Sequence, residues 1–456
     1  MAPAEPLPWA PMVEGDPLES QPAVPGPARG GGPRRRVLGI GVAVTVAIVV
    51  AGLIASGAIR LDGRQAGHAV RIALVDAAGG LRTLNADGTD RRVHTVDSLA
   101  FQFPAWSPDG SHIAAIGHDG ADSGVFVFDD RAAGDAGATA AEPVAAYRSP
   151  RAAPIYLYWS PDGRRIAFLT GEPDGLALQV ASADGSAPAA VVRRGQPLYW
   201  DWIDASHVFV HSGANAPGAF LGEVAVDTSD VQSIEASVGA FQAPAMSLDG
   251  RSRAYVALGE GRSTSVVVEA RDGSFRHEAR VSAGSALGWS PAGDQLAYTN
   301  SPVPIGLPVG PLELIDVRSG TTRQLVDGPV VAWFWAPDGR TLAVLRFRVP
   351  GDGQVVAAGG RFLAATDRLA LRLLFVDVAT GAIRFGREVR LSDLVLAQFL
   401  PFADQYARSH RVWAPGSDVI VLPLQDETGS SHVTIVPADG SAERRIADGV
   451  AAFWSP

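Results

Sequence analysis

The sequence predicts an all-β protein whose folded part, residues 69–456, is a β-propeller of four-stranded blades. Two observations lead to this prediction. The phrase Trp-Ser-Pro-Asp-Gly, or a close variant, recurs along the chain, and most copies lie 41–46 residues apart. Each copy is followed by further short apolar runs with turn residues between them. Repeats of about 40–50 residues with four strands each are typical of propellers.

The amino-acid composition excludes several functional classes. With 38 Lys and Arg against 48 Asp and Glu, the net charge is −10, which disfavours a nucleic-acid-binding protein. The absence of cysteine rules out disulfide bonds and thiolate metal sites. The 456-residue chain is too long for one ordinary core, and its 51 glycines and 33 prolines fit many short strands joined by tight turns.

The N-terminal part predicts a membrane anchor. Residues 1–36 are Pro-rich, lack an apolar period and end in three arginines, which predicts a disordered cytoplasmic tail. The uncharged run 37–59 is long enough for one transmembrane helix, and residues 60–68 form a linker. Because the arginines precede the run, the propeller is expected outside the plasma membrane of a single-pass protein. A cleaved signal sequence is the alternative, since residues 55–58 are small.

Within one repeat, the residue types specify two strands and the turn between them. In the copy at 159–169, an apolar strand ends at the Trp and Ser-Pro-Asp-Gly makes a tight turn. Proline fixes φ, Asp bonds the turn backbone and Gly takes a positive φ. A second strand follows, and runs such as 373–377 and 322–326 represent the third and fourth strands.

The number of repeats predicts the number of blades. Aligned on the Trp position, the repeats begin at Trp106, Trp159, Trp202, Met246, Trp289, Trp335, Trp413 and Trp454. We therefore expect eight blades, or seven if one of the two degraded repeats, at Trp202 and Met246, is not a blade. The copy at 450–454 supplies only a first strand, and 70–97 supplies the other three. Pairing these two segments would close the ring and leave no open sheet edge.

The repeated phrase resembles the WD40-like PD40 repeat of TolB-type β-propellers, "PxWSPDGxxIAF", and the resemblance covers about 69–456. It implies the propeller fold, which hosts many functions. The chain departs from TolB itself in three respects: a membrane anchor, no recognisable TolB N-terminal domain, and more repeats than six blades need.

Loops that interrupt the repeat mark a candidate binding face. The insertions 301–311 and 349–370 and the connector 391–410 are expected on the face opposite the Asp-Gly turns, which looks away from the membrane. The candidate residues on this outward face are Ile305, Leu307, Phe362, Phe399, Phe402 and Tyr406. A second candidate set lies at the expected mouth of the central channel and comprises Gln102, Tyr156, Tyr199, Gln242, Ser285, Trp333 and His410. The Trp residues of the phrase are expected to pack between blades.

A search for catalytic or metal-binding patterns identifies none. His207 and His211 are four apart on a predicted strand, about 13 Å, too far to share an ion. The repeated aspartates of the phrase belong to turns, and neither a G-x-S-x-G element nor a phosphate-binding loop is present. We therefore expect no catalytic residue, no metal and no cofactor.

These observations together predict a membrane-anchored, extracytoplasmic propeller that acts as a non-enzymatic interaction or scaffold module. It is expected to bind a protein or peptide through its outward face. Two alternatives remain open: a propeller lyase or hydrolase acting on polysaccharide or peptide at the channel mouth, and an envelope sensor that signals through the N-terminal tail.

Overall fold

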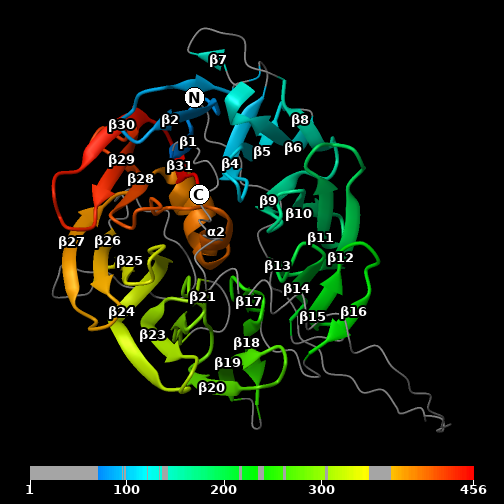
Figure 1. The fold of residues 1–456 in the computed structure, drawn as a ribbon, viewed down its shortest axis with the longest axis vertical. Coiled ribbons are helices and arrows are strands. Elements are labelled where there is room, and N and C mark those ends of the chain that lie inside the picture. The colour runs from blue at the N-terminus through cyan, green and yellow to red at the C-terminus, as the bar shows by residue number, and fades with distance from the viewer. Residues whose placement is uncertain are drawn as a thin grey trace, which may run out of the picture. The chain divides into compact units, whose positions relative to one another are not determined.

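A computed structural model describes residues 70–456, apart from 95, 97–98, 121, 133, 136–141, 215–217, 235–240, 260–262, 303–306 and 349–370. The predicted tail, membrane segment and linker lie outside the described residues. In the part of the chain that is described, no helix is long and apolar enough to span a bilayer. Residues 69–456 form one unit in which the sheets follow one another around a ring (Figure 1).

The first four sheets along the ring are antiparallel, and within each sheet successive strands lie farther from the centre (Figure 1). The sheet at the chain ends has the order β31-β1-β2-β3-β7, with β1 (Arg71–Val75), β2 (Leu81–Asn85), β3 (Arg92–Val93), β7 (Gly134–Asp135) and β31 (Ala451–Trp454). The next is β4 (Ala100–Trp106), β5 (His112–His118), β6 (Ser123–Asp129) and β8 (Val144–Ser149). The following two are β9 (Pro154–Trp159), β10 (Arg165–Glu172), β11 (Gly175–Ser182), β12 (Ala190–Gly195), and β13 (Leu198–Trp202), β14 (His207–Ser212), β15 (Phe220–Ala225), β16 (Val231–Ser233).

The remaining sheets complete the ring. One sheet contains β17 (Ala245–Met246), β18 (Ser252–Leu258), β19 (Thr264–Ala270) and β20 (Arg276–Val281). A seven-stranded sheet contains β21 (Leu287–Trp289), β22 (Gln295–Thr299), β23 (Gly310–Asp316), β24 (Thr322–Trp335), β25 (Thr341–Phe347), β26 (Leu371–Asp377) and β27 (Ile383–Val389). The last contains β28 (Val419–Gln425), β29 (Ser431–Pro437) and β30 (Arg444–Asp448). Short helical segments are η1 (Asp130–Ala132), η3 (Val395–Phe399), η4 (Leu400–Phe402) and α2 (Ala403–Ser409).

The seven-stranded sheet consists of two four-stranded units that share β24. In its first half, Val326 pairs with Leu312 of β23, and in its second half Trp335 pairs with Leu342 of β25. The strand is therefore the outer strand of one unit and the inner strand of the next. In the three-stranded sheet, Trp413 forms an isolated bridge with Ile420 and so occupies the inner-strand position.

The predicted closure of the ring is confirmed. β31 pairs with β1 in antiparallel register, from Ile72 opposite Trp454 to Val75 opposite Ala451. Beyond the strand, the Arg71 N–H donates to Ser455 Oγ at 2.9 Å and the Ser455 N–H donates to the Arg71 carbonyl at 2.8 Å. Segments almost 400 residues apart in sequence thus form one sheet, and neither inner edge is left unpaired.

Each part of the repeated phrase has a local role in the turn. Ser160 Oγ donates to Asp162 Oδ1 at 2.6 Å and accepts from the Arg165 N–H at 3.0 Å. Asp162 Oδ1 also accepts from the Arg164 N–H at 3.1 Å, and Gly163 has φ of 68°. Equivalent bonds link the corresponding residues after Trp106 and Met246. The side chains of the phrase thus satisfy the turn backbone, as the sequence predicts.

The Trp residues connect neighbouring inner strands, which confirms their predicted position between blades. The Trp159 indole N–H donates to the Ala105 carbonyl at 2.9 Å, and the Trp413 indole N–H donates to the Phe334 carbonyl at 2.8 Å. In each case the acceptor directly precedes the Trp position of the previous repeat. The same bond is made by Trp106, Trp202, Trp289 and Trp335. Where Met246 replaces Trp, its backbone N–H donates instead to Asp201 Oδ2 at 2.8 Å.

Candidate binding cavity and the segment that fills the channel

The segment 391–410, which we call the plug segment, turns into the centre of the ring, where α2 lies surrounded by the sheets (Figure 1). The sequence predicts that Phe399 and Tyr406 of this segment lie on an outward-facing loop. In the structure they are inside, with 3% and 4% of their surface exposed. The reason is that the segment forms η3, η4 and α2 and packs its apolar side chains against the inner strands.

An aromatic cluster fixes the plug segment to the inner strands. Phe399 and Tyr406 stack with ring centroids 4.8 Å apart, and Phe103 of β4 lies 5.0 Å from Tyr406. Phe103 has φ of 43° and sits where the pairing of β4 with β5 shifts register. A positive φ is costly for a bulky residue, and a bulge re-aims a side chain. The strain at Phe103 therefore accompanies its contact with the plug segment.

Two tyrosines predicted at the channel mouth hold the backbone of α2. The Tyr156 hydroxyl donates to the Gln405 carbonyl at 3.0 Å, and the Tyr199 hydroxyl lies 3.2 Å from the same oxygen and 2.9 Å from Tyr156 Oη. Burial is the main cause that raises the pKa of both phenols, so they remain neutral donors. Their role in this structure is to bind the chain's own helix.

His410, the third ionisable residue predicted at the mouth, is a neutral structural group. Its Nε2 faces the Phe103 carbonyl at 3.0 Å, so this nitrogen donates. Nδ1 then accepts from the Ser409 hydroxyl at 2.7 Å. Burial lowers the pKa of His410 to about 4, against the opposing effect of the bond to Phe103. Both ring nitrogens are satisfied, so the side chain is not available as a ligand or base.

An ion pair anchors the C-terminal end of α2. Arg408 Nη1 lies 3.1 Å from Asp201 Oδ2 and also donates to the Pro244 carbonyl, while Nη2 donates to the Leu287 carbonyl at 3.3 Å. The two side chains are 11% and 5% exposed. Burial raises the pKa of Asp201, and Arg408 acts in the opposite direction. A single arginine thus joins α2 to three neighbouring repeats.

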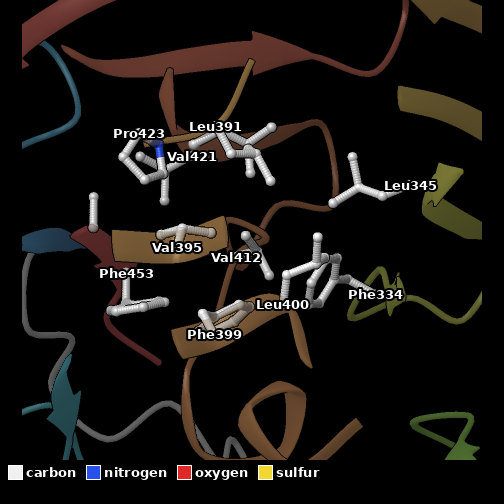
Figure 2. Close-up of a pocket in the computed structure, with 12 residues that line it drawn as sticks. Phe334, Leu345, Leu391, Val395, Phe399, Leu400, Val412, Val421, Pro423 and Phe453 are labelled. Atoms are coloured by element: carbon white, nitrogen blue, oxygen red, sulfur yellow. The ribbon is translucent and has the colours of Figure 1, made fainter. Parts of the chain in front are cut away.

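The contact between the plug segment and the ring is tightly packed on one side. An apolar crevice of about 20 Å³ lies between the two. Val395, Phe399 and Leu400 point into it from the plug segment (Figure 2). Phe334 and Phe453 close it from the inner strands. The crevice has room for about one water and no polar partners for it, so it is part of the core.

A much larger cavity, of about 540 Å³, lies beside α2, whose residues form part of its lining. Its rim includes the exposed turn prolines Pro108, Pro161, Pro337 and Pro415, and its lining also includes Leu307 and Pro308 from the opposite face. The cavity therefore runs along the channel beside α2. Its size is that of a small-molecule site. The repeated phrase was expected to be structural only, yet its Trp and Pro residues form the wall.

The polar groups of this cavity come mainly from α2 and the residues after it. Burial raises the pKa of Asp404 to about 6, while Arg408 acts to lower it. Burial also raises the pKa of Tyr158 well above its usual value. Arg411 is exposed to the cavity, and partial desolvation lowers its pKa. The Tyr158 phenol acts in the opposite direction and raises the pKa of Arg411.

The other predicted residues are distributed around these two regions. Trp333, Leu307 and His410 line the large cavity. Gln242 and Ser285 are buried beside each other, where the Ser285 N–H donates to Gln242 Oε1 at 3.2 Å. Gln102 is half-buried on β4 and Phe402 is half-buried against the core. Ile305 and Phe362 lie outside the described residues.

The sequence does not single out the polar groups of the cavity, which are Tyr158, Asp201, Asp404, Arg408 and Arg411. A signal for two of them exists, since Asp404 and Arg408 are four residues apart, a spacing that places both on one face of a helix. Asp201 and Tyr158 each directly precede a Trp of the repeat, a position that no motif in the sequence marks as functional. In the described part of the chain, no group of three or more His, Asp or Glu side chains is arranged to hold a metal ion.

No protein-family model matches the chain, and no curated protein matches its sequence. Solved structures resemble its fold. A eukaryotic initiation factor is 13% identical, with 85% of this chain and 99% of that chain covered and a TM-score of 0.51. A prolyl endopeptidase is 10% identical, with 78% and 50% covered and a TM-score of 0.51. TolB from Acinetobacter baumannii is 15% identical, with 57% and 63% covered and a TM-score of 0.36. At these identities the two likenesses with a TM-score of 0.51 show the β-propeller fold alone.

Proposed function

We propose that this chain is a non-enzymatic interaction module: a membrane-anchored, extracytoplasmic TolB-like propeller that binds a protein or peptide through its outward face. The observation that carries the proposal is the anchoring of the plug segment. Aromatic packing, two tyrosine hydroxyls and the Arg408–Asp201 pair hold it against several inner strands. A segment held this firmly presents a preformed surface, and a partner then avoids the free-energy cost of ordering a loop.

The direction of the strands supports the choice of face. Strands alternate in direction within each sheet, so β27 ends on the face where the inner strands begin. The plug segment leaves the sheet from that face, and the loop that contains Leu307 leaves from it too. This is the face opposite the Asp-Gly turns, where the sequence analysis placed the binding loops.

We propose that the ring has eight blades. The double role of β24 and the inner position of Trp413 support this number, because each of the eight Trp-aligned positions then begins one blade. The degraded repeats at Trp202 and Met246 each have a four-stranded sheet of their own, β13–β16 and β17–β20.

One observation favours the alternative of an enzyme acting at the channel. Asp404 borders the large cavity with a pKa of about 6, a value suited to a general acid or base near neutral pH. Under this alternative, Asp404→Asn abolishes turnover of a peptide or polysaccharide while leaving binding unchanged. Under the interaction proposal, Asp404→Asn leaves partner binding unchanged and there is no turnover to lose.

Site-specific photo-crosslinking of the membrane-anchored chain tests the binding face. A crosslinking residue is placed at Ala397, an exposed position of η3 that does not line the cavity. Matched controls carry it at Ala407, which is exposed to the cavity, and at Val231, which is 56% exposed on the outer strand β16. We expect a defined protein adduct at Ala397 alone. Equal adducts at Val231, or adducts confined to Ala407, contradict the proposal.

A further inference from the structure

The large cavity beside α2 is not explained by an interaction through the outward face. It is preformed, because its wall consists of inner strands joined by the indole hydrogen bonds of the repeat. Leu248, Leu307 and Pro308 give it apolar surface, and Trp289 and Trp335 are only partly buried there. A cavity of about 540 Å³ with mostly apolar walls and a few polar groups is typical of a site for a small organic molecule.

The charges in the cavity indicate the charge of its ligand. The Arg408 guanidinium is neutralised by Asp201, and Asp404 lies within reach of the same arginine. Arg411 differs from Arg408 in having no such partner. Its guanidinium makes no hydrogen bond or ion pair with any residue that the structure describes, and no carboxylate compensates it. The charge of Arg411 is therefore available to a bound anion.

The geometry of the polar groups narrows the class of anion. A guanidinium presents two parallel N–H donors that match the two oxygens of a carboxylate. Tyr158, which precedes Trp159, adds a phenol that stays protonated and can donate to the same anion. One uncompensated cation balances one negative charge. A phosphate monoester, with nearly two charges at neutral pH, would leave one negative charge without a counter-ion beside the single free guanidinium and be disfavoured.

We propose that the channel cavity binds a small organic monocarboxylate with an apolar body, its carboxylate on Arg411 and Tyr158 and its apolar part against the inner-strand wall. This ligand site is separate from the outward-face partner. Neither proposal depends on the other, because Arg411 lies on the cavity wall and Ala397 does not.

Calorimetric titration of the purified full chain with octanoate tests this inference. We expect saturable one-to-one binding that Arg411→Gln weakens by about tenfold to a hundredfold, the loss typical of a charged hydrogen-bond partner. Arg411→Lys keeps the positive charge but lacks the two parallel N–H donors of the guanidinium, and it is expected to give an intermediate affinity. Arg251→Gln, at a turn residue whose side chain is 87% exposed, is the matched control and is expected to bind octanoate normally.

Three further probes separate the parts of the proposal. Butanoate is expected to bind more weakly than octanoate because it buries less apolar surface. Octanol and octyl phosphate are both expected to bind more weakly than octanoate. Thermal unfolding of each variant shows whether the fold is retained, and Arg411→Lys serves if Arg411→Gln does not fold. Octanoate that does not bind at millimolar concentration, binds Arg411→Gln normally, or binds no better than octanol overturns the proposal.

Discussion

The repeated phrase and the plug segment both border the channel, but they are built in different ways. Six Trp residues of the phrase donate the same indole hydrogen bond to a carbonyl of the preceding inner strand. The same contact therefore joins neighbouring repeats at six positions of the ring. The plug segment uses each side chain once. Arg408 has its own acceptors, His410 its own carbonyl and Phe399 its own aromatic neighbours.

This difference indicates how the stabilising free energy is distributed around the channel. A repeated contact spreads stabilisation over the ring, so the loss of one copy is tolerated, as at Met246, where a backbone N–H bond to Asp201 replaces the indole bond. An unrepeated contact has no substitute elsewhere. We therefore expect single changes in the plug segment to cost more than single changes in the phrase.

The largest effect is expected for Phe399→Ala. Phe399 is 3% exposed and contacts Phe103, Phe334, Tyr406, His410 and Phe453. Loss of a buried aromatic ring typically lowers the free energy of unfolding by about 3–5 kcal/mol. Urea unfolding followed by circular dichroism measures it. Phe402→Ala, which truncates a half-buried ring of the same segment, is the control. Equal losses for the two variants would contradict the comparison.

An intermediate effect is expected on acidification and depends on His410. Its pKa is about 4 when folded, below the ordinary 6.5, so the folded state binds the proton less readily than the unfolded state. The stabilisation is complete above pH 6.5 and is lost as the pH falls toward 4, by up to about 3 kcal/mol. Unfolding midpoints measured across this window are expected to fall less steeply in His410→Asn.

Asp404 is expected to change the free energy of unfolding with pH in the direction opposite to His410. Its pKa of about 6 lies above the ordinary 3.8, so its protonated form favours folding and stability rises as the pH falls from 6 toward 4. Asp404→Asn is therefore expected to steepen the acid loss that His410→Asn reduces. Identical pH profiles for the two variants would contradict the assignments.

The smallest effect is expected from a single indole bond. Trp159→Phe removes the donor to the Ala105 carbonyl, whereas the Trp454 indole N–H is buried without a hydrogen-bond partner in the described residues. Both replacements lose similar apolar volume, so their difference isolates the bond. We expect Trp159→Phe to lower the free energy of unfolding by about 1 kcal/mol more than Trp454→Phe. Equal losses in chemical denaturation would show that the bond does not stabilise the ring.

The sequence predicted the elements that depend on local chemistry. The turns after Trp159 and Met246 and the pairing of 451–454 with 71–75 follow from residue type and spacing, because turn residues and strand periods act over short distances. The path of residues 391–410 depends on contacts with strands hundreds of residues away. The structure brings Tyr156 and Tyr199 into contact, but no local rule indicates that they bind the Gln405 carbonyl.

The cavity was missed for a related reason. The Trp and Pro residues of the repeated phrase line the cavity, and the sequence indicates only their role in the turns. That Arg411 and not Arg408 keeps an uncompensated charge follows only from the structure, in which Arg408 pairs with Asp201. Periodicity indicates which residues face the channel. It does not indicate which of them remain free after the chain has folded back upon itself.

The pairing of β1 with β31 has a consequence for how the protein is made. During synthesis, the inner edge of β1 has no partner until β31 has been made. Until that point β1 exposes unpaired backbone donors and acceptors. During that interval the nascent chain is open to pairing with another copy, or to capture by a chaperone. The order of translation, rather than the stability of the finished ring, therefore sets the period in which this protein is most exposed to misassembly.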